Sequence, residues 1–471
     1  DGPFDRPQNL NRINLLGKYR TKLPGGGSFG LQTSMFSSKW DASGQIPERA
    51  VNRIERFGAI DSTEGGETSR INVTGDFKHF LSDQTYLKGN FYYSRYLFEL
   101  YSNFTFYLRD SINGDQIRQK EARNLTGFTG TMGRYFTQDN LEIKVEGSIG
   151  VRYDAVDDSE LSYTTARKNT LENVRLGDIF ESNLFASGDA VFTFSKWTVN
   201  TGLRMDYFKF DYYDKLLANY ETRSVDKIRF SPKLNVMFSP ANRVQLFIKT
   251  GLGFHSNDTR VIIAKTSDDI VPIGAGIDIG LNLKPINKLF ISVTGWYLYL
   301  EQEFVYVGDE GIIEPSGKTS RLGVDIGLRY QPKPWLFLDA DANYAYARAI
   351  DENKGQDYIP LAPVFTSTFG VSVKHKSGFS TALRGRYIYD RPANEDYSST
   401  AEGYFIVDAN ASYTYKLVVF SLSVENLFNT EWKETQFLTE SKLYDEDKSV
   451  EEIHFTPGFP ISVKGKLAFK F

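Results

Sequence analysis

The sequence predicts an all-β fold, a transmembrane antiparallel β-barrel of about 19 strands. Three observations predict it: the alternation in the last segment, the number of similar segments before it, and the lengths of their connections. In residues 459–471 apolar side chains occupy one parity, and Lys464, Lys466 and Lys470 lie on the other. Successive side chains of a strand point to opposite faces, so this strand has one apolar and one cationic face. That pattern suits a barrel with lipid outside and water inside, while an edge strand of a soluble β domain is the alternative.

The rest of the chain repeats this period of two from end to end. Helical patterns are scarce, and the best of them, residues 169–180, predicts one or two helical turns inside a long connection. So many strands in an open sheet would leave long edges free to pair with other chains, which favours closure into a barrel. We expect strands at residues 12–22, 28–40, 69–81, 85–106, 126–136, 140–153, 182–194, 197–212, 227–238, 243–255, 270–283, 288–305, 319–330, 335–348, 364–374, 379–389, 403–413, 418–429 and 459–471.

The connections between these strands alternate between short turns and long loops. Outer-membrane barrels have short periplasmic turns and long extracellular loops, whereas a soluble meander has no reason to segregate loop length by end. The alternation therefore favours the barrel. The short connections are residues 24–27, 82–84, 137–139, 195–196, 239–242, 284–287, 331–334, 375–378 and 415–417. The long ones are 41–68, 107–125, 154–181, 213–226, 256–269, 306–318, 349–363, 390–402 and 430–458.

The composition is consistent with this fold and excludes several function classes. The chain has no cysteine, so disulfides and thiolate chemistry are excluded. Aromatic residues make up 15%, which matches the aromatic girdles at the two membrane interfaces. The net charge of −4 does not indicate the basic surface that nucleic-acid binding requires. No apolar run is long enough for a transmembrane helix.

The alternation also predicts which side chains meet lipid and which face the lumen. A Lys or Arg at the bilayer midplane costs about 2–4 kcal/mol, so the charged parity should face inward. We expect Leu246, Ile248, Val324, Ile326, Leu467 and Phe469 to point to lipid. We expect Lys249, Asp325, Arg329, Lys464 and Lys466 to point to the lumen.

Three stretches resemble the barrel domain of TonB-dependent outer-membrane receptors. They are residues 39–70, residues 253–260 with 308–322, and residues 424–432 with the sequence VENLFNTEW. The resemblance covers essentially all of residues 1–471 and implies a multi-pass protein of the Gram-negative outer membrane. It also implies a plug domain and a segment that binds the coupling protein TonB, and neither is recognisable in this sequence.

The strand count predicts an open seam. The last strand must end at the periplasm, and counting back through the connections sends the first strand, residues 12–22, in the same direction. Bacterial single-chain barrels normally have an even number of strands. The resemblance implies 22 strands, so we expect about three strands and the plug domain to be missing before Asp1. We therefore expect residues 12–22 and 459–471 to flank a gap, or a gap filled by another chain.

Candidate substrate-binding residues lie on or next to long loops, because functional groups concentrate on loops held by a rigid scaffold. We expect contributions from three of them, residues 41–68, 256–269 and 430–458. The candidates are Trp40, Gln45, Arg49, Arg56, His255, Asn257, Asp258 and Arg260. For the first loop the alternative is a segment held in place by its own ion pairs. In the second loop His255 and Asp258 supply only two ligands, so no metal site is predicted.

Catalysis has little support, because the four histidines are scattered and the sequence contains neither GxSxG nor HExxH. The sequence predicts an importer of a scarce solute, with siderophore-like iron complexes the commonest cargo that the resemblance implies. Oligosaccharides, peptides and cobalamin stay open as cargo. A passive porin and a barrel that anchors a larger complex are the alternatives. The expected partners are TonB, outer-membrane lipid, a small molecule and, less directly, a surface lipoprotein or other subunits, with no cofactor.

Overall fold

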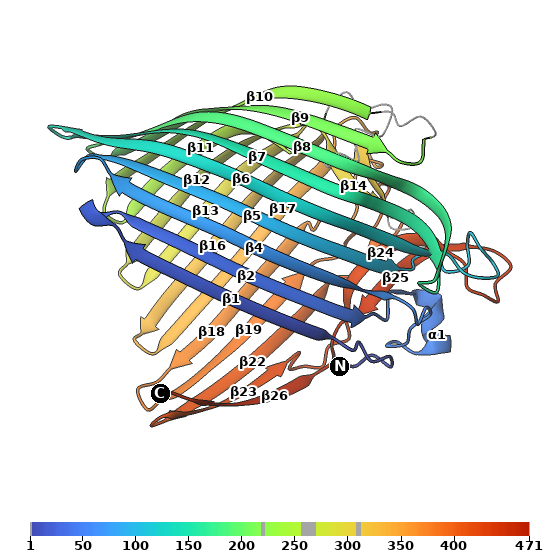
Figure 1. Cartoon of the computed structure of the whole chain (residues 1–471). Helices are drawn as coiled ribbons and strands as arrows, with labels where there is room; N and C mark the ends of the chain where they lie inside the picture. The colour runs from blue at the N-terminus through green and yellow to red at the C-terminus, as the bar shows by residue number, and fades with distance from the viewer. Residues whose placement is uncertain (1, 218–221, 256–269, 308–311, 471) are drawn as a thin grey trace.

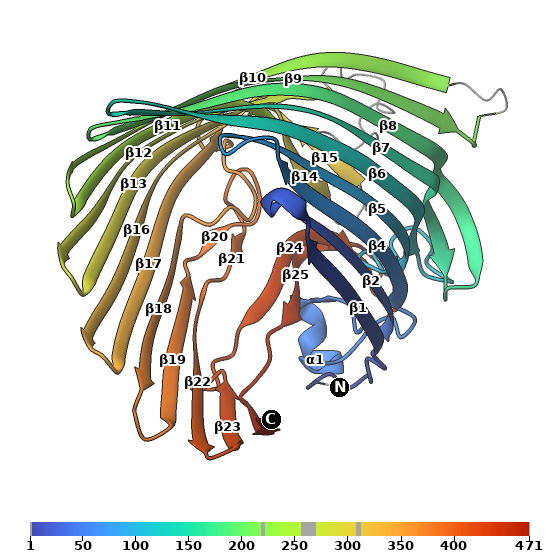
Figure 2. The same ribbon diagram turned by 60° about the vertical axis from the view of Figure 1, so that its left-hand side comes forward.

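The computed structural model describes residues 2–217, 222–255, 270–307 and 312–470 (Figure 1). Its main element is one antiparallel sheet of 19 strands that curves into a barrel wall (Figures 1 and 2). Each wall strand pairs with the next wall strand along the chain, so the topology is an up-and-down meander. Every strand predicted from the alternation is present, which confirms the fold class.

The wall consists of β1 (Asn11–Lys22), β2 (Ser28–Asp41), β4 (Gly65–Phe80), β5 (Thr85–Ser102), β6 (Gln116–Gln138), β7 (Leu141–Thr165), β8 (Asn169–Phe194), β9 (Trp197–Asp214), β10 (Thr222–Ala241), β11 (Val244–Phe254), β12 (Ile273–Ile286), β13 (Leu289–Leu300), β16 (Thr319–Lys333), β17 (Leu336–Ala349), β18 (Phe365–Lys374), β19 (Phe379–Ile388), β22 (Tyr404–Tyr415), β23 (Val418–Glu425) and β26 (Ser462–Phe469). The connections contain β3 (Ile46–Pro47), β14 (Glu303–Val307), β15 (Ile312–Ser316), β20 (Arg391–Pro392), β21 (Thr400–Ala401), β24 (Lys433–Ser441), β25 (Val450–Pro457), η1 (Pro24–Gly26), η2 (Glu48–Ala50) and α1 (Val51–Ile54). Across the described ranges, no helix is both long and apolar enough to span a membrane.

The two faces of the wall carry different side chains, as the alternation predicts. Leu246, Ile248, Val324, Ile326, Leu467 and Phe469 are all exposed. The strand registers place them on one face, where Ile248 pairs with Ile279 and Leu467 with Phe420. The predicted lumenal charges occupy the opposite parity, and three of them bond to polar side chains of other strands: Arg329 donates to Asp341 at 2.9 Å, Lys464 donates to Glu425 at 2.8 Å, and Asp325 accepts from Asn343. The predicted register is therefore confirmed.

The wall is much taller on one side than on the other. β6, β7 and β8 have 23, 25 and 26 residues, whereas β23 and β26 have eight each. Three predictions were wrong here, and two of them concern residues 154–181: these residues are not a long loop, and residues 169–180 form no helical turn but belong to β8. Residues 116–125, expected in a loop, belong to β6. Beyond the lipid both faces of a strand meet water, so the apolar alternation disappears while the hydrogen-bonded ladder continues.

An open seam separates the first and last wall strands. Within the described residues β1 pairs with β2 alone, and β26 pairs with β23 alone, which confirms the predicted gap. Residues before β1 lie near the outer end of β26, where the Phe4 ring meets Phe57 at 5.9 Å and Phe459 at 6.1 Å, both edge-on. Free strand edges cannot stay unpaired in lipid, because each unsatisfied backbone group costs several kcal/mol there.

Cysteine cross-linking can test the seam in outer membranes, because the parent protein has no cysteine. We expect Leu16→Cys on β1 to form no disulfide with Lys464→Cys, Lys466→Cys or Ala468→Cys on β26. Leu16→Cys with Ser34→Cys, which pair across β1 and β2, is the positive control. Cβ atoms must approach to about 4 Å for a disulfide, so a band from any β1–β26 pair would show that the two strands are neighbours.

Candidate functional site

Three connections at the long-loop end of the barrel pack into one body, which we call the cap: residues 42–64, 390–402 and 430–458. β25 pairs with β24 and with β3, so that Phe455 lies opposite Ile46. Ile46, Ala401 and Phe455 are each at most 1% exposed and form the core of the cap with Ala393 and Ile453. A loop with a hydrophobic core of its own holds its polar groups in fixed positions.

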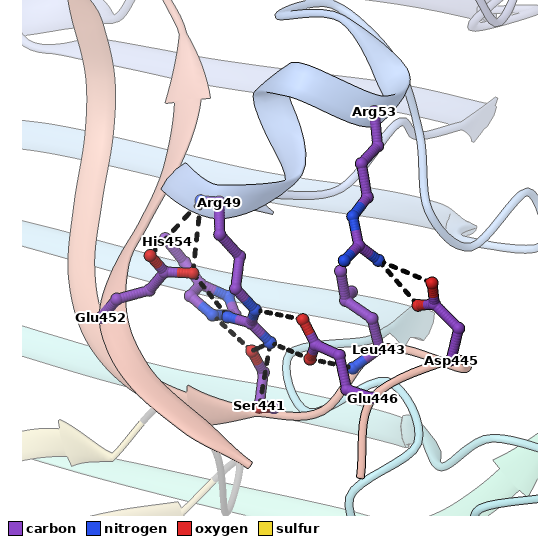
Figure 3. A network of polar contacts seen from close by, with 8 residues as sticks. All are labelled: Arg49, Arg53, Ser441, Leu443, Asp445, Glu446, Glu452 and His454. Carbon is purple, nitrogen blue, oxygen red and sulfur yellow. Dashed lines mark hydrogen bonds and ion pairs between the residues drawn. The ribbon is translucent and has the colours of Figure 1, made fainter. Parts of the chain in front are cut away.

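Arg49 on η2 joins the first and the last connection of the cap (Figure 3). Its Nε and Nη2 donate to the two carboxylate oxygens of Glu446, both at 2.8 Å, and its Nη1 donates to Glu452 at 2.5 Å. Nη2 also donates to the carbonyl oxygen of Ser441 at 3.0 Å. The alternative of a loop held by its own ion pairs is wrong for Arg49, because its partners come from a segment 392–403 residues away.

The electrostatics of this cluster favour the charged forms. Burial works against the charge of Arg49, but hydrogen bonds to Glu446 and Glu452 outweigh burial and raise its pKa. The hydrogen bond from Arg49 in turn lowers the pKa of Glu446. Arg49, Glu446 and Glu452 have side chains 18%, 14% and 20% exposed, so the network is largely shielded from water. The N–H groups of the Arg49 guanidinium donate to other groups of this protein. Arg49 therefore acts as a clamp between two loops.

His454 on β25 lies directly beside this clamp. Its ring stacks on Phe106 at 5.8 Å, and its Nε2 lies 2.9 Å from the Ser441 hydroxyl. Burial and the neighbouring charge of Arg49 lower the pKa of His454 to about 3, so the imidazole is neutral. Ser441 and His454 are both 0% exposed, so this pair is closed to solvent and offers no accessible nucleophile.

The structure places the other predicted residues in different surroundings. Arg56 donates to Glu431 and to the Trp432 carbonyl oxygen, and Gln45 has a buried Oε1 without a hydrogen-bond partner, so both belong to the cap. Trp40 lies one residue before the end of β2, opposite Gly66 and on the lumenal parity. His255 follows β11 and is not part of the cap. Asn257, Asp258 and Arg260 lie outside the described residues, so the second loop stays a prediction.

A cavity that the sequence did not predict lies on the lumenal face of the tall side of the wall. It has a volume of about 390 Å³, and we call it the wall cavity. Tyr96 on β5 pairs with Arg123 on β6, and both have the parity opposite to lipid-facing Leu97. Its lining residues are Tyr96, Phe98, Gln119, Lys120, Glu121, Arg123, Arg152, Asp154, Val156, Ser159, Glu160, Leu161, Arg175, Ile179 and Glu181.

Asp154 is the centre of the polar groups in the wall cavity. Arg123 donates to it from Nε at 2.7 Å and also from Nη2, and Arg152 donates from Nη2 at 2.8 Å. The Asp154 side chain is 1% exposed, and Arg123 and Arg152 are 36% and 37% exposed. A bidentate guanidinium–carboxylate pair fixes the orientation of both groups, so the arginines are presented to the cavity in a defined geometry. The sequence signal was the spacing of Arg152 and Asp154, which puts both on one strand face.

The part of the chain that the structure describes contains no group of three His, Cys, Asp or Glu side chains placed to hold a metal ion. The polar clusters are pairs and networks of arginine with carboxylates. Such groups bind and orient a ligand through hydrogen bonds. The arrangement therefore suits recognition of a polar molecule at the long-loop end.

Comparison with known proteins agrees with this geometry. The family model described as "TonB dependent receptor-like, beta-barrel" matches residues 6–427. The chain belongs to this family. It is a β-barrel of the Gram-negative outer membrane with the function of a receptor and transporter, so its short turns face the periplasm and the cap lies outside the cell. A search of curated protein sequences finds no significant match.

Solved structures show the same fold as this TonB-dependent receptor barrel at low identity. The unliganded ferric citrate transporter FecA has a TM-score of 0.82 and 14% identity, with 98% of this chain and 70% of that chain covered. The siderophore receptor PiuA from Acinetobacter baumannii has a TM-score of 0.78 and 12% identity, covering 100% and 76%. The ferric yersiniabactin uptake receptor FyuA from Yersinia pestis has a TM-score of 0.77 and 10% identity, covering 100% and 74%. These relatives are transporters and receptors.

Proposed function

We propose that this TonB-dependent receptor imports a small solute that the cap captures and the wall cavity binds. Import would be driven by TonB, which couples the proton gradient of the inner membrane to the barrel. We also propose that the contact with TonB, the domain that fills the lumen and the strands that close the seam lie outside residues 1–471. Arg49 and Arg56 serve this function by ordering the cap, and contact of Trp40, Gln45 or the loop after His255 with cargo is part of the same proposal.

One observation carries the proposal: a rigid cavity with charged and aromatic lining at the extracellular end of a large barrel. Tyr153 is the last large exposed apolar side chain along β7, aromatic residues gather at membrane interfaces, and its neighbours Arg152 and Asp154 line the cavity. A solute that enters from outside therefore meets this cavity at the level of the outer interface of the membrane. A cavity of this size lies within the range of about 300–1,000 Å³ typical of small-molecule sites.

A deletion strain tests the import function. We expect loss of the gene to slow growth on limiting amounts of one nutrient, and complementation to restore growth. Uptake should stop when tonB is deleted or when a protonophore removes the proton gradient, because the active importer needs that energy. Uptake that continues without TonB would support the passive porin in its place. A nutrient screen covering iron chelates, copper, cobalamin and oligosaccharides with no uptake defect would favour a structural role in a larger complex.

A further inference from the structure

We propose that the wall cavity binds an uncharged, polyhydroxylated ligand of the oligosaccharide class, and that this is the cargo. The inference rests on the proposed import function and narrows its substrate. It is carried by three features of the cavity: the balance of its charges, the way those charges are paired, and the aromatic surface beside them.

The charges that line the cavity cancel. On the lumenal parity three basic side chains, Arg123, Arg152 and Arg175, stand with three acidic ones, Glu121, Asp154 and Glu181. An anionic metal chelate that entered this cavity would lose its hydration without meeting an excess of positive charge. Such burial of an uncompensated charge is unfavourable, whereas an uncharged ligand has no such cost.

The central charges of the cavity are also bonded to each other, which keeps them in place. Arg123 and Arg152 both donate to Asp154. To bind a strongly charged ligand, these groups would have to break pairs that are already formed. A hydroxyl group needs no such change, because it can donate to a carboxylate oxygen and accept from a guanidinium N–H at the same time.

An aromatic surface completes the cavity. The Tyr96 and Phe98 rings lie parallel, with centroids 6.0 Å apart and planes 18° apart. Apolar Val156, Leu161 and Ile179 line the cavity as well. A sugar ring has apolar C–H faces and a rim of hydroxyl groups, so it can contact an aromatic face and hydrogen-bond at its edge. Side chains held rigid before binding lose little entropy when the ligand arrives.

A binding experiment with the full-length receptor, purified from outer membranes in detergent, tests this inference. The probes are an array of neutral oligosaccharides, followed by calorimetry with the tightest hit and, separately, with ferric citrate. We expect a neutral oligosaccharide to bind and ferric citrate to show no binding. Tyr96→Ala and Arg152→Gln should each weaken binding about tenfold, since one removes the ring contact and the other removes a charge-assisted donor.

Arg204→Gln is the matched control. Arg204 pairs with Asp206 two residues along β9, as Arg152 pairs with Asp154 on β7, and both carboxylates are fully buried. Arg204 does not line the wall cavity, so its replacement should leave oligosaccharide affinity within about twofold. Loss of affinity in Arg204→Gln equal to that in Arg152→Gln would assign the effect to general wall disruption and overturn the inference.

The outcomes separate this inference from the proposed function. Ferric citrate binding that Arg152→Gln weakens, with no oligosaccharide bound, would overturn the inference, and TonB-dependent uptake of the chelate would still uphold import. Oligosaccharide binding that follows the expected variant pattern, without any TonB-dependent uptake, would uphold the ligand class and refute import. Binding of neither probe class would overturn the assignment of the cavity.

Discussion

Replacing Arg49 with alanine should release the cap from the barrel end. The substitution leaves Glu446 and Glu452 close together without the cation that both bind. Breaking a fully buried ion pair costs about 3–5 kcal/mol. The remaining exposure of these side chains reduces the expected loss to about 2 kcal/mol for cap closure. That loss raises the open fraction about thirtyfold, and cargo uptake should fall with it.

Hydrogen exchange measures this effect directly. Backbone amides of β24 and β25 should exchange about thirtyfold faster in Arg49→Ala, while β11 amides in the wall stay unchanged. Arg53→Ala is the control, because Arg53 pairs with Asp445 at 2.7 Å but their side chains are 49% and 67% exposed. An exposed pair contributes at most about 1 kcal/mol, so little change is expected there. Equal exchange in the two variants would show that Arg49 is not the clamp.

Acidification should open the cap through His454. In the open state the imidazole meets water and has a pKa of about 6.5, whereas in the closed state burial and Arg49 hold its pKa at about 3. Between those values the open state binds more protons, so cap stability falls as pH falls from 6.5. At pH 5 the difference amounts to about 2 kcal/mol relative to pH 7.

None of the charged groups near His454 favours protonation of its imidazole. Arg49 opposes an imidazolium, and the carboxylates of Glu446 and Glu452, which could favour one, are already bonded to Arg49. The lowered pKa of Glu446 adds stability that is lost only as pH falls through its folded value.

We expect His454→Gln to remove most of the pH dependence of β25 exchange between pH 7 and 5. His375→Gln, at an exposed periplasmic turn, should leave it intact. The same slope in wild type and His454→Gln would refute the role of His454.

Local regularities in the sequence were enough to predict the strands of the barrel wall. The backbone sends successive side chains to opposite faces, so the parity of Leu467 against Lys466 already separated lipid from lumen. The same rule gave all the wall strands and, with the connection lengths, the long-loop end. It failed where the strand leaves the lipid, as at Asp154–Glu181 on β7 and β8, because water on both sides removes the apolar signal while backbone pairing continues.

The candidate site depended on contacts between residues far apart in the chain. Arg49 was singled out from its own loop, but its partners Glu446 and Glu452 are 397 and 403 residues away, and nothing in the local pattern joins them. The wall cavity likewise needs Tyr96, Arg123 and Asp154 from three adjacent strands, whose lateral register is set by the ladder as a whole. Alternation follows from the geometry of one strand and can be read residue by residue. Pairing of charges across strands and loops follows from chain folding, so only the tertiary structure decided which arginine clamps the cap and which ones line the cavity.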